Sequence, residues 1–394
     1  MITNILLTDM KHYFLLFILL LVIITIEGCT EELHPETNGT NSPVLNEGEL
    51  TKAVLDLSVN TFAVEAQAET RASIPSNIPE NETSEEKEVH NIWVFQYDAV
   101  TKELLIKPRY YTITDQIMLQ DLPVYLKAGI PSFVYVVTNT GYDNWVNDDT
   151  DTSWQKFKNL EQLKKQTLPT AFPLRSIDKV SIPMVGASEE VEVTTGITVT
   201  VPVTRMYAKL KVKVEMLKAE MKLNNVNVRQ IPNICRIETF AGDGNGEPMN
   251  AVPFPDGTTF SSIAFAASDL EKSEDKEWAV FYVPENLQGE IENQGGNKSD
   301  AAPTNALVVD VTAEIGGEKY LYAAYPGGNS LNNFNIQRNQ VYRMTLTITG
   351  EKGQNNPSSN CFVVKPNGFL SFEPYYRVET GGGYNFADYL SPHD

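Results

Sequence analysis

The stretch Tyr207-Ala208-Lys209-Leu210-Lys211-Val212-Lys213-Val214 alternates apolar residues with lysines. A period of two places successive side chains on opposite faces of a β-strand. This stretch therefore predicts a strand over residues 207–216, with its apolar side chains in a core and its lysines in water.

Similar short runs, rich in aromatic and β-branched residues and bounded by Gly, Pro and Asn, recur through most of the chain, which is typical of β-structure. Before Tyr207 the predicted strands are 91–97, 104–106, 110–114, 116–119, 133–138, 182–186, 191–193 and 197–203. After it they are 225–230, 278–283, 306–315, 319–325 and 340–350. Residues 241–276 and 285–304 are expected to be rich in loops.

One helix is predicted from a three-residue apolar period. Trp154, Phe157, Leu160 and Leu163 follow this spacing and predict a helix from Trp154 to Gln166 that packs one face on a sheet. Many strands joined by turns, with one or two short helices, indicate a mainly β fold of two β-sandwich-like domains. The domain boundary is expected near residues 215–225.

A separate strand is predicted near the front of the chain, in Val54-Leu55-Asp56-Leu57-Ser58-Val59. Leu55, Leu57 and Val59 alternate with polar residues, and together with Phe62 and Val64 they would bury one apolar face. Residues 30–53 form a polar tether, and residues 65–87 show no apolar period. Because a lone strand has no partner, this one is expected to join a sheet formed later in the chain.

A secretory leader is predicted at residues 1–28. Its apolar run, Tyr13 to Ile26, is too short for a typical membrane span and is preceded by Lys11 and His12. Cys29 directly follows Gly28, and this end of the leader resembles the lipobox of bacterial lipoproteins, although Glu27 departs from that pattern. The resemblance implies that residues 1–28 are removed and that Cys29 is acylated, which tethers the exported chain to a membrane.

Charge and histidine content argue against several classes of function. The net charge of −20 argues against nucleic acid binding, which requires a basic face. Catalytic triads and catalytic metal sites generally need a well-placed imidazole. Of the four histidines, His90 alone falls in a segment expected to fold, at the edge of a strand; the others are His12, His34 and His393. No catalytic residue, metal site or cofactor is predicted, although carboxylate pairs for glycoside cleavage stay open.

Cys235 and Cys361 remain after Cys29 is assigned to the lipid. In an oxidising compartment they either pair with each other or stay two separate buried thiols. The sequence leaves both alternatives open.

Several short motifs follow one another in order along the chain. They are Glu69-Thr70-Arg71-Ala72, Ile182-Pro183-Met184-Val185-Gly186, Val203-Thr204-Arg205-Met206-Tyr207-Ala208-Lys209-Leu210, Phe281-Tyr282-Val283-Pro284-Glu285-Asn286, Tyr325-Pro326-Gly327-Gly328, Asn333-Phe334-Asn335-Ile336-Gln337-Arg338-Asn339 and Asn360-Cys361-Phe362-Val363-Val364. Each motif is short, but in their order and spacing, over nearly the whole chain, they resemble the fimbrillins of type V pili of the Bacteroidales.

The resemblance implies a structural subunit of a surface fimbria that supports adhesion. It implies two transthyretin-like domains, 72–215 and 216–355, behind a propeptide, 29–71, that carries the lipid and the first strand. An arginine-specific protease would cut between Arg71 and Ala72 and remove that strand, and a strand from another fimbrial subunit would fill the groove. The implied partners are other subunits, the protease, the outer membrane before maturation and a surface receptor.

The segment 356–394 is the candidate donor of that strand. Phe372, Tyr376, Val378, Tyr384 and Phe386 give it an aromatic pattern around the glycines 381–383. The alternative interpretation is that this tail is the last strand of the second domain. For the cut, Lys87 lies in a stretch like that of Arg71 and is a competing site.

Two further functions stay open at this point. One is an uncleaved surface lipoprotein that acts as a pilus anchor or adhesive tip. The other is a glycan-binding or glycan-degrading outer-membrane lipoprotein, for which tryptophans would supply a platform. Burial is the expected state of such aromatic residues; the four tryptophans are Trp93, Trp145, Trp154 and Trp278.

Overall fold

The structure is a computed structural model of the chain. It describes residues 50–64, 83–116, 120–141, 153–168, 174–178, 181–216, 219–237, 250–273, 276–292, 301–315, 317–328, 332–348, 361–366, 376–379 and 384–385. Cys29, Arg71, Ala72, Phe372 and Phe386 lie outside these residues.

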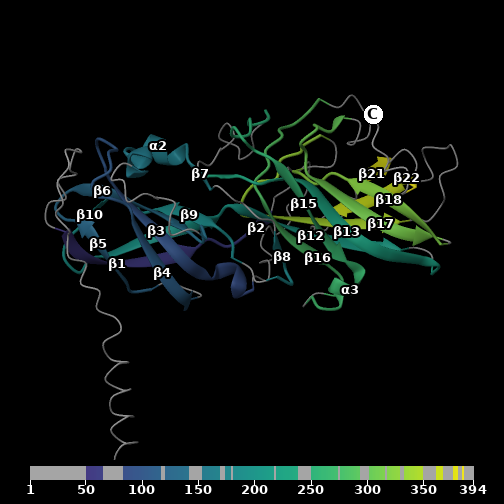
Figure 1. The fold of residues 1–394 in the computed structure, drawn as a ribbon, viewed down its shortest axis with the longest axis horizontal. Helices are drawn as coiled ribbons and strands as arrows, with labels where there is room; N and C mark the ends of the chain where they lie inside the picture. The colour runs from purple at the N-terminus through teal and green to yellow at the C-terminus, as the bar shows by residue number, and fades with distance from the viewer. Residues whose placement is uncertain are drawn as a thin grey trace, which may run out of the picture. The chain divides into compact units, whose positions relative to one another are not determined.

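The first sheet contains the N-terminal strand in its interior (Figure 1). Its strands, in spatial order, are β4 (Arg109–Gln116), β3 (Val89–Asp98), β6 (Pro131–Thr138), β9 (Met184–Ala187), β11 (Thr198–Arg205), β1 (Leu50–Val59) and β5 (Leu122–Lys127), while β10 (Val191–Glu192) pairs with β6. The pair β1–β11 is parallel, whereas its neighbours in the sheet are antiparallel.

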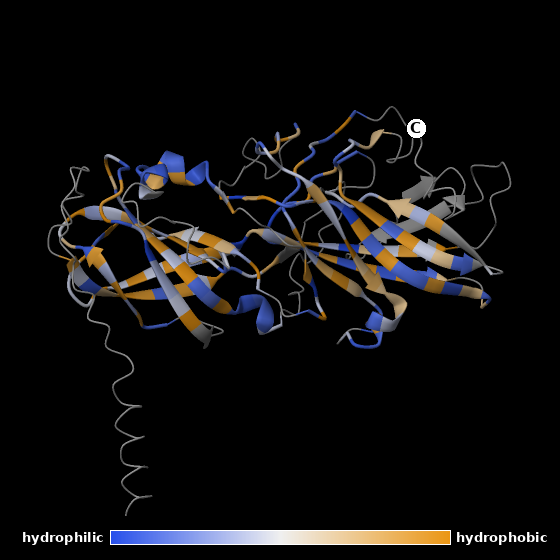
Figure 2. Ribbon diagram, in the orientation of Figure 1, coloured by the Kyte–Doolittle hydropathy of each residue, from blue (hydrophilic) through white to orange (hydrophobic). Residues whose placement is uncertain are grey.

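Alternate residues of these strands enclose a first core. Ile113 of β4 and Val124 of β5 contribute to the same apolar cluster, although β4 and β5 are the two ends of the sheet. The sheet therefore curls around its own core. Figure 2 shows the bands of hydrophobic and hydrophilic residues that alternate along the strands.

A second and a third sheet follow in sequence. The second contains β21 (Tyr376–Glu379), β20 (Cys361–Pro366), β19 (Gln340–Ile348), β12 (Tyr207–Met216), β16 (Ala279–Pro284) and β8 (Leu174–Arg175), with β2 (Ala63–Val64) paired to β19. The third contains β15 (Phe260–Ala266), β13 (Met221–Pro232), β17 (Val308–Ile315), β18 (Glu318–Ala324) and β22 (Tyr384–Asn385). A small pair joins β14 (Cys235–Arg236) to β7 (Thr167–Leu168).

The second and third sheets share one core. Leu210 and Val212 of β12 lie in the same cluster as Val226 and Val228 of β13. This is the arrangement of a β-sandwich, in which inward residues of two sheets interdigitate. The prediction of a mainly β fold with short helices is confirmed. The strand pairing assigns β12, which was expected to close the first domain, to the second sheet.

The predicted helix from Trp154 to Gln166 is wrong as a continuous element. It is a 3₁₀ helix, η2 (Ser153–Phe157), followed by a short helix, α2 (Leu160–Lys164). Asn159 interrupts it with extended backbone and caps α2 by accepting a hydrogen bond from the N–H of Gln162. The predicted apolar face is nevertheless buried, and it packs with Phe95 and Tyr97 of β3. Among the described residues, the other helices are η1 (Glu85–Lys87) and α3 (Ala267–Leu270).

Several strand predictions need correction. Residues 104–106 do not form a strand, and Leu104 makes an isolated bridge to Tyr97 instead. The predicted strand 116–119 is described only at Gln116, which ends β4. The predicted loop region 241–276 contains the strand β15. Its alternation of apolar and polar residues is weak, and pairing with β13 stabilises it. The strand β5 was not predicted.

Gly186 gives one of the short motifs a physical reason. A Cβ atom built at this position would lie 2.0 Å from the backbone oxygen of Pro202. Since β9 pairs with β11 at this point, Gly186 permits an approach of the two strands that any side chain would block.

Candidate assembly site

The strand β1 is hydrogen-bonded on both sides. It runs parallel to β11, from Val54 opposite Thr198 to Val59 opposite Val203. It runs antiparallel to β5, and this ladder ends with Leu55 opposite Leu122. The sequence predicted that the isolated strand joins a sheet formed later in the chain, and it does.

The side chains of β1 fill the first core. Ala53 and Leu55 are fully buried, Leu57 is 4% exposed, and Val59 is half-buried against the same cluster. Ser58 is exposed, and the carboxylate of Asp56 accepts a hydrogen bond from the N–H of Asp121 at 2.9 Å. β1 therefore contributes both main-chain bonds and apolar packing to the middle of the first sheet.

The prediction of one apolar face from Leu55 to Val64 is wrong. Phe62 is buried in a different cluster, together with Tyr207, Tyr282 and Val341 of the second sheet. Ala63 and Val64 form β2, which pairs in parallel with β19. The alternation breaks at Asn60 and Thr61, so the segment leaves one sheet and enters the next.

Polar side chains hold this crossing between the sheets. Arg205 at the end of β11 donates from Nη1 to the carbonyl of Asn60 at 2.8 Å. Asn339, just before β19, donates from Nδ2 to the carbonyl of Thr61 at 2.8 Å. The Asn60 side chain donates to the hydroxyl of Thr204 at 2.8 Å. The crossing is thereby fixed at each of its residues.

The ring of Phe62 faces two cations. The guanidinium carbon of Arg205 lies 4.1 Å from the ring centroid, and the Lys209 ammonium lies 5.7 Å from it. Arg205 is fully buried and Lys209 is 4% exposed. Such desolvated cation–π contacts are worth about 2 kcal/mol. An aromatic residue at position 62 is therefore favoured by cation–π attraction as well as by the shape of the surrounding core.

Glu86 of η1 completes what is called here the junction cluster: Glu86, Arg205, Lys209, Tyr282 and Asn339. The fully buried Glu86 carboxylate lies 2.8 Å from the Lys209 ammonium and accepts hydrogen bonds from the Tyr282 hydroxyl and the N–H of Thr83. Its backbone carbonyl accepts a hydrogen bond from Arg205 Nε at 2.9 Å. Burial raises the pKa of Tyr282 and the Glu86 charge raises it further, so the phenol stays a donor.

Burial of Lys209 corrects the prediction that the lysines of β12 face water. Lys211 and Lys213 are half-buried, and Lys213 pairs with Glu277 at 2.9 Å. Periodicity identified the correct face of the strand for each lysine. At the start of β12, however, Phe62 and Glu86 cover that face and exclude solvent from Lys209.

Sequence reasoning singled out four members of the junction cluster as motif residues but gave them no role. Arg205, Lys209, Tyr282 and Asn339 come from three of the quoted motifs, and the fold brings them together around Asn60 and Phe62. Glu86 was missed. It lies in an acidic stretch without an apolar period, and a polar residue in such a stretch ordinarily indicates a solvated loop.

The C-terminal strands pair within their own chain. β20 pairs with β19, β21 pairs with β20, and β22 pairs with β18. Tyr376 and Val378 of the candidate donor segment lie in β21, and Tyr384 lies in β22. In this structure these strands thus extend the second and third sheets.

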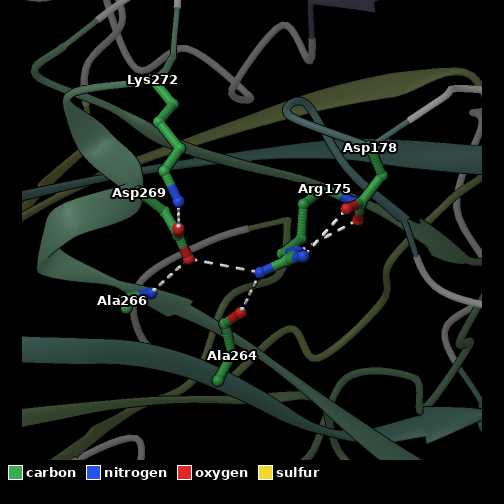
Figure 3. Close-up of polar contacts among 6 residues, drawn as sticks. All are labelled: Arg175, Asp178, Ala264, Ala266, Asp269 and Lys272. Atoms are coloured by element: carbon green, nitrogen blue, oxygen red, sulfur yellow. Dashed lines mark hydrogen bonds and ion pairs between the residues drawn. The ribbon is translucent and has the colours of Figure 1, made fainter.

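A charged cleft lies beside β8 and has a volume of about 680 Å³. Figure 3 shows Arg175 between Asp178 and Asp269, with Lys272 on the far side of Asp269. The Arg175 guanidinium lies 2.9 Å from Asp178 and 3.3 Å from Asp269. Arg175 also donates to the carbonyl of Ala264. The cation is engaged by these groups, so the arrangement ties β8 to α3 and β15.

Other candidates from the sequence are structural where the chain is described. Cys235 is a free thiol, and burial raises its pKa. The backbone N–H of His90 donates to the side chain of Asn139, and its ring lies 3.7 Å from Glu88. Trp93 and Trp154 are buried. The described part of the chain contains no cluster of metal-ligating side chains and no helix able to cross a membrane.

Comparisons with known proteins were made in three ways. A sequence-family model described as a domain of unknown function (DUF4906) matches residues 281–346. No curated protein matches the chain in sequence. Solved structures with a similar fold include fimbrial proteins and putative cell adhesion proteins.

Three of these neighbours illustrate the similarity. The C-terminally truncated tip fimbrial protein Mfa3 from Porphyromonas gingivalis has 14% identity and a TM-score of 0.46, over 77% of this chain and 97% of that one. A fimbrial assembly protein from Parabacteroides distasonis has 14% identity and a TM-score of 0.44, over 81% and 95%. The fimbrial anchor protein Mfa2 from Porphyromonas gingivalis has 13% identity and a TM-score of 0.37, over 84% and 100%.

Proposed function

We propose that this chain is a structural subunit of a cell-surface fimbria. It is exported as a lipoprotein acylated at Cys29, cut after Arg71 and polymerised by strand exchange, and the fibre supports adhesion. The observation that carries the proposal is the place of β1, an N-terminal strand in the interior of a sheet formed by later residues. Residues 65–82, which include Arg71, connect it to the rest of the fold.

Loss of the segment from β1 to Phe62 would be costly. Leu55, Leu57 and Phe62 each contribute about 1.5–3 kcal/mol by burial, or about 5–9 kcal/mol together. That is comparable with the whole stability of a domain, about 5–15 kcal/mol. Removal would also expose the unpaired main-chain groups of β11 and β5. A groove of this kind favours a replacement strand strongly.

A replacement from a second copy satisfies both needs. A groove in one subunit and a strand from the next make a head-to-tail contact, and repetition of such a contact builds a filament. The C-terminal strands are suitable donors, because β22 and the pair β20–β21 lie at the ends of their sheets, so that they can leave without removing a strand from the interior of either sheet. The strand pairing also favours a domain division near Met206, between β11 and β12, over one at 215.

The experiment that tests this function compares the full-length protein with Arg71→Gln after treatment with an arginine-specific protease. The expected result is a ladder of SDS-resistant polymers from the natural chain, with Ala72 as the new N-terminus, and monomer from Arg71→Gln. A cut chain that starts at Ala72 and stays monomeric would overturn the proposal. So would a ladder of equal strength from the uncut variant.

The junction cluster favours a second candidate, an uncleaved anchor or tip lipoprotein. It adds hydrogen bonds and cation–π contacts that retain Asn60 to Phe62. N-terminal analysis of native protein separates the two candidates: a start at Cys29 in the membrane fraction supports the anchor or tip, and a start at Ala72 in shed fibres supports the stalk subunit.

A further inference from the structure

The contacts around Asn60 and Phe62 define what a replacement strand must carry. The Asn60 side chain and the Phe62 ring are both recognised, by Thr204 and by Arg205 with Lys209. Between them, the exposed Thr61 contributes its carbonyl to Asn339. The site therefore selects the pattern Asn-x-Phe at the end of an extended apolar strand, with a free choice at the middle position.

The C-terminal region repeats this pattern as Asn367-Gly368-Phe369. When Phe369 is aligned with Phe62, Phe362 and Val364 fall on the buried Leu55 and Leu57. Lys365 falls on the exposed Ser58, and Gly368 falls on the exposed Thr61. The match begins at Cys361, because the residue before it, Asn360, falls on the fully buried Ala53.

Pro366 falls on Val59, and the ladder geometry accommodates a proline there. The N–H groups of Val54 and Asn60 donate to carbonyls next to and within β11, at Ile197 and Val203. Alternate residues of a parallel ladder share a direction, so the N–H of Val59 points to the side of β5. The ladder with β5 ends at Leu55, so a proline at this position removes no ladder hydrogen bond.

We propose that Cys361–Phe369 of a second copy takes the place of Val54–Phe62 in the groove, in the same direction and register. This rests on the proposed function, and it selects one stretch of the C-terminal region as the donor. Asn367 and Phe369 lock the register, since Thr204 receives the Asn367 side chain as it receives that of Asn60, and Arg205 and Lys209 receive the Phe369 ring as they receive that of Phe62. The junction cluster thus retains the first strand before cleavage and selects its replacement afterwards.

The register makes a sharp prediction for Cys361. It takes the position of Val54, which is paired with Thr198. Neighbouring strands lie about 4.8 Å apart, within the Cα separation of about 4.4–6.8 Å that a disulfide spans. In cut, polymerised Thr198→Cys, most subunits should therefore be joined by an intermolecular disulfide under mild oxidation, seen as a reductant-sensitive ladder in denaturing gels after boiling.

The matched control is Thr200→Cys, an exposed residue of the same strand that is paired with Asp56 and would face Val363. It should give at least ten-fold less disulfide, and Cys361→Ser in the Thr198→Cys chain should abolish the product. Polymers without a Cys361-dependent product in Thr198→Cys would overturn this register while leaving strand exchange intact. Absence of polymer from the cut natural chain would instead overturn the proposed function.

Peptide binding gives an independent measurement. The cut protein, freed of residues 29–71, is titrated with labelled peptides of residues 361–369, in which serine replaces Cys361, and of residues 54–62. Both peptides should bind. The substitution Phe369→Ala should weaken binding of the 361–369 peptide by at least ten-fold, because Arg205 and Lys209 then have no aromatic ring to contact. Equal binding of the Phe369→Ala peptide would overturn the inference. Failure of the 54–62 peptide to bind would count against the groove itself.

Discussion

Lys209 lies on the face of β12 that strand periodicity assigns to water, and it is buried against Glu86. A buried ion pair persists because its remaining hydrogen-bonding groups are also satisfied, here by Tyr282 and by the N–H of Thr83. The pair brings together η1 and β12, which are far apart in sequence. Loss of either partner would leave the other as a buried, uncompensated charge, which would destabilise the fold.

Replacement of Glu86 by Gln should destabilise the uncut protein. It leaves the Lys209 cation buried without its charged partner, and such a loss costs about 3–5 kcal/mol. The measurement is the free energy of unfolding from urea denaturation. Glu161→Gln is the matched control, because the Lys164–Glu161 pair is exposed and its loss should cost less than about 1 kcal/mol. Similar losses from both variants would contradict the role of the buried pair.

At the scale of the element, β1 is stabilised both by main-chain pairing on its two sides and by side-chain packing in the first core. Its main chain pairs with β11 and β5, and Leu55 and Leu57 fill the first core. After the crossing at Asn60, Thr61 and β2 tie the same segment to the second sheet through Asn339 and β19. A single short segment therefore links two cores.

Leu55→Ala should lower the stability of the uncut chain by about 2–5 kcal/mol, because it removes a fully buried side chain and leaves a cavity. The midpoint of urea denaturation measures the change. Ser58→Ala, at an exposed position of the same strand, should change stability by about 0.5 kcal/mol or less. If the two variants behaved alike, β1 would not be packed in the first core.

The attachment of β8 to α3 should depend on pH. The hydrogen bond from Arg175 holds the pKa of Asp178 below its usual value, and the hydrogen bond from Lys272, with the Arg175 charge, does the same for Asp269. A carboxyl group with a lowered folded-state pKa stabilises the fold above its unfolded pKa, and the contribution is lost as pH falls through the folded value.

Arg175→Gln should therefore be less stable than the natural chain by a constant amount between pH 5 and pH 7. The difference should narrow below about pH 4, where the carboxyl groups begin to protonate in the natural chain. Urea denaturation across this pH range measures it. Arg109→Gln is the control, since Arg109 lies over the ring of Tyr125 and its effect should not follow carboxylate titration. A difference that widens at low pH would contradict the assignment.

At the scale of the whole molecule, charge decides how subunits meet. The full chain carries a net charge of −20, and residues 72–394, which remain after the proposed cut, carry 28 Lys and Arg against 41 Asp and Glu, a net charge of −13, so two cut copies still repel one another. The repulsion is long-ranged at low ionic strength, where the screening length is about 30 Å at 0.01 M salt, and it falls to about 8 Å at 0.15 M.

Polymerisation of the cut protein should therefore be several-fold faster at 0.15 M than at 0.01 M NaCl. Light scattering after protease inhibition measures the rate. Uncut Arg71→Gln should show no growth at either concentration, which separates assembly from salt-induced aggregation. A rate that falls with added salt would indicate that attraction between opposite charges, rather than screened repulsion, controls the encounter.

Strand positions were predictable to different degrees. The strand over 207–216 was predicted with the bounds of β12, because a long alternating run reports the backbone period directly. β5 was missed because Pro123 interrupts its pattern, and its place at the end of the first sheet explains why a proline is tolerated there. β15 was missed because its serines and alanines give little contrast, and pairing with β13 rather than local preference forms it.

The sequence by itself determined many of the extended segments, that the fold is mainly β, and that one strand stands apart at the front of the chain. The tertiary structure alone decided that this strand lies between β11 and β5, that Phe62 belongs to a different core from Leu55, and that Glu86, Arg205, Tyr282 and Asn339 meet around it. The physical reason is that a period of two fixes the two faces of a strand. It carries no information about which distant residues cover each face, because those contacts form by long-range packing.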